Sequence, residues 1–378
     1  MLHAEVVGGA TLTFGLAVAL LWSGLAPASY RTTVLHHFSS HALLSWGLGS
    51  LHELVINGLM TLFFFAVGLE LSREIRVGQL RDIRRAVVPV WAALGGMVAT
   101  AMLMHIVGWL AHSPAMRSAW GVPMATDIAF ALGVLALAGP RIPKQLRLFL
   151  LTLAVADDIF SVIALALTGP HAPSVAWLGG ALALGAGVWS VSRRIPPLLW
   201  WLALVGMWAL FTKAGVEPSL AGVALGVLAP FQGDRSAGHR LEPVVMVTSN
   251  WAVLPLFAII AVGIDWTAFA WSEGAVHYGI ALATARVVGK VVGITGIIAL
   301  ARRAGLESQS TLPLSMYAAM SLLCAVGFTV PLLFAGNVFS SGGPLYSMTT
   351  LALLVASAVS GLLGVWWLRH LSTRHVAE

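Results

Sequence analysis

The chain has 378 residues, of which 58% are hydrophobic and only 10% are charged, and its mean hydropathy is +0.89. Ordinary soluble domains carry about 25% charged residues, so this composition excludes a soluble globular protein and indicates a polytopic membrane protein. The formal net charge is +6. It would suit a nucleic-acid-binding protein only if the cations formed one patch, which they do not.

Apolar stretches recur along the whole sequence. Each is about 17 to 25 residues long and could cross a hydrocarbon core about 30 Å thick as a helix. No Lys or Arg precedes the first stretch, so we expect it to be retained rather than cleaved as a signal peptide. We expect a single transmembrane domain, residues 1–378, whose twelve spans lie near residues 8–26, 55–71, 86–110, 119–138, 146–168, 174–192, 197–213, 217–231, 247–264, 276–300, 313–335 and 346–368.

The basic residues are distributed unequally between alternate loops. One side of the expected topology carries sixteen of the 21 Lys and Arg residues, whereas the other carries only Arg31, Arg117 and Lys213. By the positive-inside rule the basic side is cytoplasmic, and an even number of spans then places both termini there. The basic excess therefore reflects membrane topology. The expected partner is the lipid bilayer, and no nucleic acid partner is expected.

Three acidic residues lie inside expected spans. Asp127 lies in "GVPMATDIAFALGV", and Asp157 and Asp158 lie in "LAVADDIFSVIA". A charge at the centre of a membrane helix costs about 2.5 to 3.5 kcal/mol on insertion scales, so such residues face a polar interior or a partner and suggest function. Adjacent helical positions point about 100° apart. One aspartate of the pair can therefore face a cavity while its neighbour faces another helix.

The expected tenth span supplies two buried cations. In "ARVVGKVVGITG", Arg286 and Lys290 lie four residues apart on one helix face. Pairing one aspartate with Lys290 would lower the cost of burying both, and a buried lysine is also a candidate proton carrier. A purely structural ion pair is the alternative. Arg286 could face the same cavity or extend toward the outer membrane interface.

Two expected spans contain residues that interrupt a helix. "GVPMATDIA" places Pro123 in the middle of the fourth span, and "CAVGFTVPLLFAG" places Pro331 in the eleventh. Proline removes one backbone hydrogen bond and clashes with the preceding turn. Non-helical backbone at this depth is tolerated only where protein buries it or water reaches it. Interrupted spans in both halves of a sequence are typical of the ion site of a transporter, although each could also be a simple kink.

Six motifs together resemble one family. "FFFAVGLELSREI", "ATDIAFALGVLAL", "AVADDI", "LAGVALGVLAP", "GKVVGI" and "GFT" occur in the order typical of the NhaA family of bacterial sodium/proton antiporters, and the resemblance covers residues 8–368. It implies an all-α integral membrane protein of twelve helices with inverted-topology repeats, in which spans 4 and 11 unwind and cross. Such interrupted spans are known in this family and in other transporters. The resemblance further implies a transporter of the bacterial inner membrane. It implies neither an enzyme nor a cofactor beyond the transported Na+ or Li+ and H+.

The resemblance also implies roles for individual residues. Asp158 would be the principal ligand of the cation and of the proton, with Asp157 beside it. Asp157 would pair with Lys290 in one protonation state and exchange partners in another. Asp127, with Thr126, would offset the helix ends that face each other at the crossing. Carboxylate, hydroxyl and carbonyl oxygens are hard ligands that suit sodium and lithium.

The resemblance places the pH-sensing region at the cytoplasmic end, with Glu70, Glu74 and Glu242 as its candidates. His239 lies in the neighbouring basic loop and is a further candidate. The chain also departs from the family pattern, because the usual GKPLGI reads "GKVVGI" and the usual GFTMSI reads "GFTVPL". Arg286 is an additional cation where an apolar residue is usual, and we expect it to modulate the site.

Other functions remain open from the sequence. The intramembrane aspartates would also serve a passive cation or proton channel, or a cation sensor. An intramembrane aspartyl protease could use Asp127 and Asp157, but the second aspartate follows "AVA" rather than the Gly-x-Gly of such enzymes. The outer connection before the second span often mediates dimerisation in this family, so a homodimer is expected. His37 and His41 lie in that connection, where a solvated loop is expected rather than a metal site.

Overall fold

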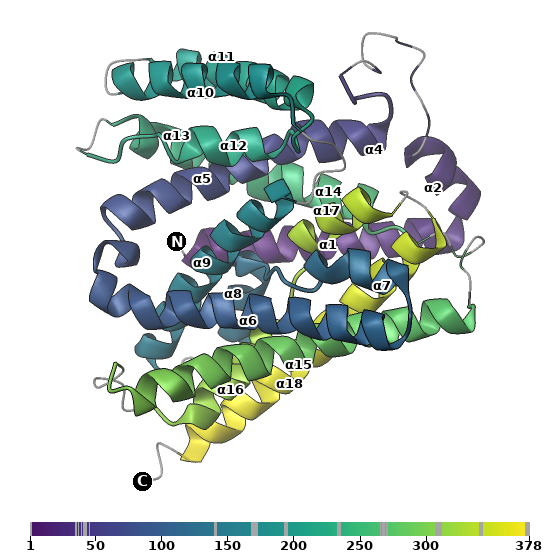
Figure 1. The fold of residues 1–378 in the computed structure, drawn as a ribbon, viewed down its shortest axis with the longest axis vertical. Coiled ribbons are helices and arrows are strands. Elements are labelled where there is room, and N and C mark those ends of the chain that lie inside the picture. Colours follow the sequence, from purple (N-terminus) through teal and green to yellow (C-terminus); the bar gives the residue numbers. More distant parts are fainter. Residues whose placement is uncertain are drawn as a thin grey trace. The chain divides into compact units, whose positions relative to one another are not determined.

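The structure is a computed structural model, shown in Figure 1. It describes residues 2–34, 36, 38, 40, 44, 46–139, 142–167, 173–192, 196–232, 236–264, 266, 269, 271–306, 312–339 and 343–374. Over these ranges the protein is all-helical and contains no strand. His37 and His41, and with them much of the expected dimerisation segment, lie outside the described residues.

The helices are named here in chain order. The first half contains α1 (Leu2–Leu25), α2 (Pro27–Val34), α4 (Leu51–Glu53), η1 (Leu54–Leu59), α5 (Met60–Arg76), η2 (Gln79–Arg81), α6 (Ile83–Leu110), α7 (Pro114–Ser118), η3 (Ala119–Gly121), α8 (Ile128–Leu137) and α9 (Lys144–Leu167). The second half contains α10 (Val175–Val191), α11 (Pro197–Ala214), α12 (Leu220–Gly226), α13 (Ala237–Thr248), η4 (Ser249–Val253), α14 (Leu254–Ala261), α15 (Glu273–Arg303), α16 (Leu314–Leu323), α17 (Thr329–Val338) and α18 (Pro344–Arg374).

Eight helical segments of the described chain are long and apolar enough to cross a membrane. They are Val7–Leu25, Leu51–Arg76, Ala86–Leu110, Lys144–Ala166, Pro197–Ala214, Ala237–Ala261, Glu273–Arg303 and Pro344–Ser372. Three shorter apolar helices are α10, α16 and α17. The expected span 217–231 contains only the seven-residue helix α12, because the chain forms turns on both sides of it.

The chain forms two compact units. One comprises Met1–Gly9, Asp82–Ala164 and Thr267–Glu378. Within this unit α15 lies along α6 and also packs against α16 and α18, as Figure 1 shows. Glycines allow the close approach of α6 and α15, since a Cβ on Gly289 would lie only 2.6 Å from the Cα of Thr100, and a Cβ on Gly293 would overlap the backbone of Gly95. The core around this contact is mostly aliphatic and includes Leu153 of α9.

The other unit comprises Ala10–Arg81 and Leu165–Trp266. Here α12 packs against α5, and α10 packs against α11. A Cβ on Gly68 of α5 would lie 2.9 Å from the Cα of Val223, so this contact also requires glycine. Phe65, Trp200 and Phe231 form the centre of the core.

Two helix interruptions lie in the first unit. Residues 122–127 are non-helical between η3 and α8, and residues 324–328 are non-helical between α16 and α17. The backbone N–H of Asp127 donates to the carbonyl of Val326 over 3.0 Å, so the two interruptions touch. Pro331 lies in the first turn of α17, where the missing N–H of proline is tolerated. These interruptions place the polar residues of the "ATDIA" and "GFT" motifs side by side.

Candidate functional site

The adjacent aspartates lie in the middle of α9 and are both buried, with 0% of Asp157 and 7% of Asp158 exposed. Asp157 has two charge-assisted partners. Its Oδ1 accepts from Nζ of Lys290 over 2.6 Å, and its Oδ2 accepts from the backbone N–H of Thr126 over 2.7 Å. Asp158 is one position further along the helix and therefore points about 100° away from these partners.

Asp127 lies at the beginnings of two helices. Its own backbone occupies the N-cap position of α8. Its side-chain Oδ2 accepts the backbone N–H groups of Phe328 and Thr329, at 3.1 and 3.2 Å, at the start of α17. The first N–H groups of a helix have no partner within the helix, and the helix N-terminus carries a partial positive charge. The carboxylate of Asp127 therefore caps the N-terminus of α17, and it makes no capping hydrogen bond to α8.

The opposite kind of helix end, the C-terminus of α16, is capped by three groups. The carbonyls of residues 324–326 accept, in order, from Oγ1 of Thr126 over 2.6 Å, from Nε of Arg286 over 2.6 Å and from the backbone N–H of Asp127 over 3.0 Å. The last carbonyls of a helix have no partner within the helix, so a buried helix end needs such donors. The "ATD" sequence of the first interruption thus supplies donors to the second.

Lys290 and Arg286 lie one turn apart on α15, and both are 0% exposed. Lys290 pairs with Asp157. Arg286 does not extend to the outer interface. Besides its bond to Ala325, its Nη2 donates to the carbonyl of Ala125 over 2.7 Å. Arg286 therefore joins α15 to both interruptions.

The site concentrates hard oxygen ligands around two cations that belong to the protein. No group of three or more His, Cys, Asp and Glu residues is arranged to hold a metal ion in the described part of the chain. Asp157 and Asp158 could hold a cation only as an exchangeable substrate, with carbonyl or water oxygens completing its shell. Such a site can bind a small cation, bind protons in its place, and release either one.

Comparison with known proteins identifies the family. Residues 1–368 match the Na+/H+ antiporter 1 family. The chain belongs to this family.

Relatives within the family are similar along nearly their whole length. The chain is 40% identical to the Na(+)/H(+) antiporter NhaA of Nocardia farcinica over 376 residues, which is 96% of this chain and 88% of the relative. It is 39% identical to the Na(+)/H(+) antiporter NhaA 1 of Saccharopolyspora erythraea, covering 96% of this chain and 89% of the relative. It is 36% identical to the Na(+)/H(+) antiporter NhaA 2 of Rhodococcus jostii, covering 100% and 93%. The resemblance predicted from the sequence motifs is therefore confirmed.

The three glutamates predicted for pH sensing lie around one arginine in the second unit. Arg73 is 2.9 Å from Glu242, 3.5 Å from Glu74 and 3.9 Å from Glu70. The residues come from α5 and α13, which pack against each other. His239 is exposed at the start of α13, where its Nδ1 and Oγ of Ser236 share a hydrogen bond of 2.8 Å. We call Glu70, Arg73, Glu74 and Glu242 the Arg73 cluster.

Sequence reasoning did not identify several members of these sites. Arg73 is one of the sixteen basic residues of the expected cytoplasmic side, and only its spacing of three residues from Glu70 indicates a pairing. Ser161 was not singled out at all. It lies one turn after Asp157 on α9, and its buried hydroxyl has no hydrogen-bond partner among the described residues. The carbonyls of Ala125 and Ala325, which accept from Arg286, are backbone groups, so no residue type in the sequence marks them. Only the expected helix interruptions indicate that carbonyls are free to bind there.

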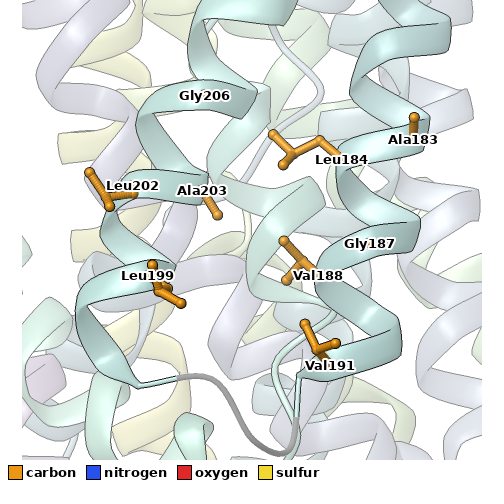
Figure 2. A pocket seen from close by; sticks show the side chains of 9 residues that line it. All are labelled: Ala183, Leu184, Gly187, Val188, Val191, Leu199, Leu202, Ala203 and Gly206. Carbon is orange, nitrogen blue, oxygen red and sulfur yellow. The ribbon is translucent and has the colours of Figure 1, made fainter.

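A groove of about 460 Å³ lies elsewhere, between α10 and α11 in the second unit. Figure 2 shows Leu184 and Val188 of α10 on one side and Leu199 and Ala203 of α11 on the other. Every residue that lines it is apolar. An ion needs polar ligands, so this groove is not the site for the transported ions.

Proposed function

We propose that this protein is a secondary active transporter that exchanges cytoplasmic Na+ or Li+ for external H+ by alternating access, and so serves pH and sodium homeostasis. Membership of the Na+/H+ antiporter 1 family and relatives named as Na+/H+ antiporters support this function. One observation of the structure carries it. Two adjacent aspartates are buried beside two helix interruptions, and a buried lysine pairs with Asp157.

Exchange follows from competition for the same carboxylate. Asp158 either binds the cation or holds a proton, so the two substrates exclude each other and their fluxes are coupled. Asp157 keeps its negative charge while Lys290 is paired with it. When a cation reaches the two aspartates, Asp157 can turn from Lys290 to the cation, and Lys290 can release its proton. Lys290 thus acts as a second proton carrier.

Asp127 and Thr126 hold the two interruptions in a fixed arrangement in this mechanism. The helix ends that meet there carry partial charges of both signs, and Asp127 offsets the positive ones. A carbonyl-lined interruption at the depth of the ion site can move as a unit without exposing unsatisfied backbone to lipid. We infer that these interruptions are the unwound, crossing spans 4 and 11 of a twelve-span fold with inverted repeats.

The Arg73 cluster is proposed as the pH-sensing region. Its carboxylates come from α5 and α13 and share one cation, so a change in their protonation would alter the contact between these two helices. His239 lies at the beginning of the same helix as Glu242 and would contribute through its charge. The positive-inside rule places this end of both helices on the cytoplasmic side.

The proposed location is the bacterial inner membrane, with several spans and both termini on the cytoplasmic side. The eight long apolar helices and the named relatives support a multi-pass membrane protein. We further propose a homodimer. A passive channel, a cation sensor and an aspartyl protease are disfavoured because the relatives are named antiporters.

The deciding experiment uses acid-loaded inside-out vesicles and a dye that reports the pH gradient. Na+, Li+ and K+ are added in turn between about pH 6.5 and about pH 9, to the unmodified protein and to Asp158→Asn. We expect a cation-dependent collapse of the gradient that disappears in Asp158→Asn. Asp82→Asn is the matched control, because Asp82 is exposed at the start of α6. A collapse without added cation would indicate a channel, and no response from folded protein would contradict exchange.

A further inference from the structure

Arg286 is a buried arginine whose bonds in this site go to backbone carbonyls of both interruptions. Nε donates to Ala325 and Nη2 to Ala125, over 2.6 and 2.7 Å. A third nitrogen, Nη1, is buried and has no hydrogen-bond partner among the described residues. The negative charges of Asp157 and Asp127 act on the guanidinium. Among the residues that the structure describes, the guanidinium thus has no carboxylate partner, although it lies within the proposed ion site.

The surrounding backbone is shaped to hold this group. A Cβ on Gly327 would lie 2.6 Å from Nη2 of Arg286 and 2.9 Å from the backbone nitrogen of Asp127. Only glycine therefore leaves room for the guanidinium at this position. The backbone N–H of Gly327 donates to Oγ of Ser357 over 3.2 Å, which fixes the residue from the other side.

The carbonyls that Arg286 occupies are of the kind that binds cations. Carbonyl oxygens released by a helix interruption are hard ligands, and transporters use them to coordinate Na+. A guanidinium that donates to two such carbonyls occupies the position that a cation would take. It also places a permanent positive charge whose field reaches Asp157, one of the two aspartates of the exchange site, and Asp127.

We propose that Arg286 is a tethered internal cation that confines the transported ion to the two aspartates and lowers the affinity of the site for it. This inference rests on the proposed exchange of Na+ or Li+ at Asp158. Arg286 is then a positioning residue. It occupies two carbonyl ligands and repels a second cation, so that the bound ion is released readily.

A merely structural arginine would have different consequences when it is replaced. Arg286→Met removes both the charge and the two hydrogen bonds. If Arg286 limits cation affinity, the KM for Na+ should fall by about ten-fold in this variant. The reason is that two positive charges in one buried site repel each other strongly even in a medium of intermediate polarity. The maximal rate should also fall, because the two interruptions lose the hydrogen bonds through which Arg286 joins them. Arg286→Lys keeps the charge, and its KM should stay within about two-fold of the unmodified protein.

The experiment measures the KM for Na+ and the maximal rate in inside-out vesicles, and the Na+ concentration that half-maximally raises the unfolding temperature of the purified protein. The second measurement does not require transport. Arg147→Met is the matched control, because Nη2 of Arg147 also donates to a carbonyl, that of Gly139 beyond the end of α8, over 3.1 Å. We expect this control to leave the KM unchanged.

The outcomes separate the inference from the proposed function. A lower KM and a lower half-maximal Na+ concentration in Arg286→Met, with neither in Arg286→Lys, support the tethered cation. An unchanged or higher KM in Arg286→Met overturns it. Should Arg286→Met fail to fold, the neutral Arg286→Gln is compared with Arg286→Lys, and an equal KM in these two overturns it. If Na+ neither drives exchange in vesicles nor raises the unfolding temperature of the unmodified protein, the proposed function itself is contradicted.

Discussion

The ion site and the Arg73 cluster both gather opposite charges, but they stabilise them differently. At the proposed ion site the side chains of Lys290 and Asp157 are 0% exposed, Asp157 also accepts from the backbone N–H of Thr126, and Arg286 donates to a backbone carbonyl rather than to a carboxylate. In the Arg73 cluster the side chains are 9% to 16% exposed, and arginine bonds directly to carboxylates. The screening length is about 10 Å at 0.1 M salt, and salt weakens interactions between exposed charges more than those between buried charges. The comparison therefore predicts that removing one charged partner from the proposed ion site strongly destabilises the protein. It also predicts that the Arg73 cluster responds to salt concentration.

The largest expected effect comes from breaking the buried ion pair. Lys290→Met leaves the fully buried Asp157 without its charged partner, which costs about 3 to 5 kcal/mol. We expect a large fall in the unfolding temperature of the purified protein, independent of salt concentration. The double variant Lys290→Met with Asp157→Asn should recover most of that loss, because no uncompensated charge remains.

The control for this prediction is Lys213→Met. Lys213 is exposed and lies over the ring of Trp46, 4.4 Å from its centroid. An exposed cation of this kind contributes about 0.5 to 1 kcal/mol. A fall in unfolding temperature equal to that of Lys290→Met would mean that the buried pair is not special.

The next effect concerns the helix ends at the interruptions. Asp127→Ala removes the acceptor of two backbone N–H groups at the start of α17 and should cost about 1 to 2 kcal/mol. We expect faster hydrogen exchange of the peptide that contains residues 324–332, measured by mass spectrometry, and no change in peptides of α5. If Asp127→Ala changed the exchange rate of both peptides equally, Asp127 would not be what stabilises this helix end.

The Arg73 cluster should show a smaller effect that depends on salt. Raising the ionic strength with choline chloride weakens attraction between partly exposed charges. The pH of half-maximal exchange should therefore move by about half a unit in the unmodified protein, since such contacts are worth less than about 1 kcal/mol. In Arg73→Gln this shift should disappear, whereas Arg73→Lys should keep it. A shift that persists in Arg73→Gln would place pH sensing elsewhere.

The residues proposed for the ion site could be singled out from the sequence more readily than their contacts. The cost of burying a charge is a property of the residue and its apolar neighbours, so Asp127, Asp157, Asp158 and Lys290 stood out without any structure. The motifs also predicted the family, which the comparison confirms. The direction of Arg286 was left open, because backbone carbonyls carry no residue-specific signal that a sequence could show.

Helix boundaries were predicted less well where an apolar stretch is not one helix. The expected span 217–231 is apolar throughout its second half, yet α12 ends at Gly226, because turns follow at residues 227 and 228. The segment 247–264 belongs to a longer helical region that begins at Ala237 with polar residues. Hydropathy reports burial in lipid or protein equally, so it cannot separate a short buried helix from a membrane span.

The smallest expected effect uses a neutral donor, which tests whether charge matters when a side chain binds backbone carbonyls. In the second unit the hydroxyl of Tyr30 in α2 donates to the carbonyls of Ile259 and Ile260, at 2.8 and 2.9 Å. Tyr30→Phe should cost only about 0.5 to 1.5 kcal/mol, well below the loss in Lys290→Met.

Burial raises the pKa of Tyr30 above its usual value, so the hydroxyl keeps its proton. A raised pKa contributes stability that is complete below the unfolded value of about 10 and is lost only as the pH rises through the folded value. The difference in unfolding temperature between Tyr30→Phe and the unmodified protein should therefore be constant from about pH 6 to about pH 9. A difference that shrinks within this range would mean that Tyr30 ionises in the folded protein. The hydroxyl would then stop donating to the carbonyls of Ile259 and Ile260 within this pH range, and Tyr30 would no longer serve as a neutral donor to compare with Arg286.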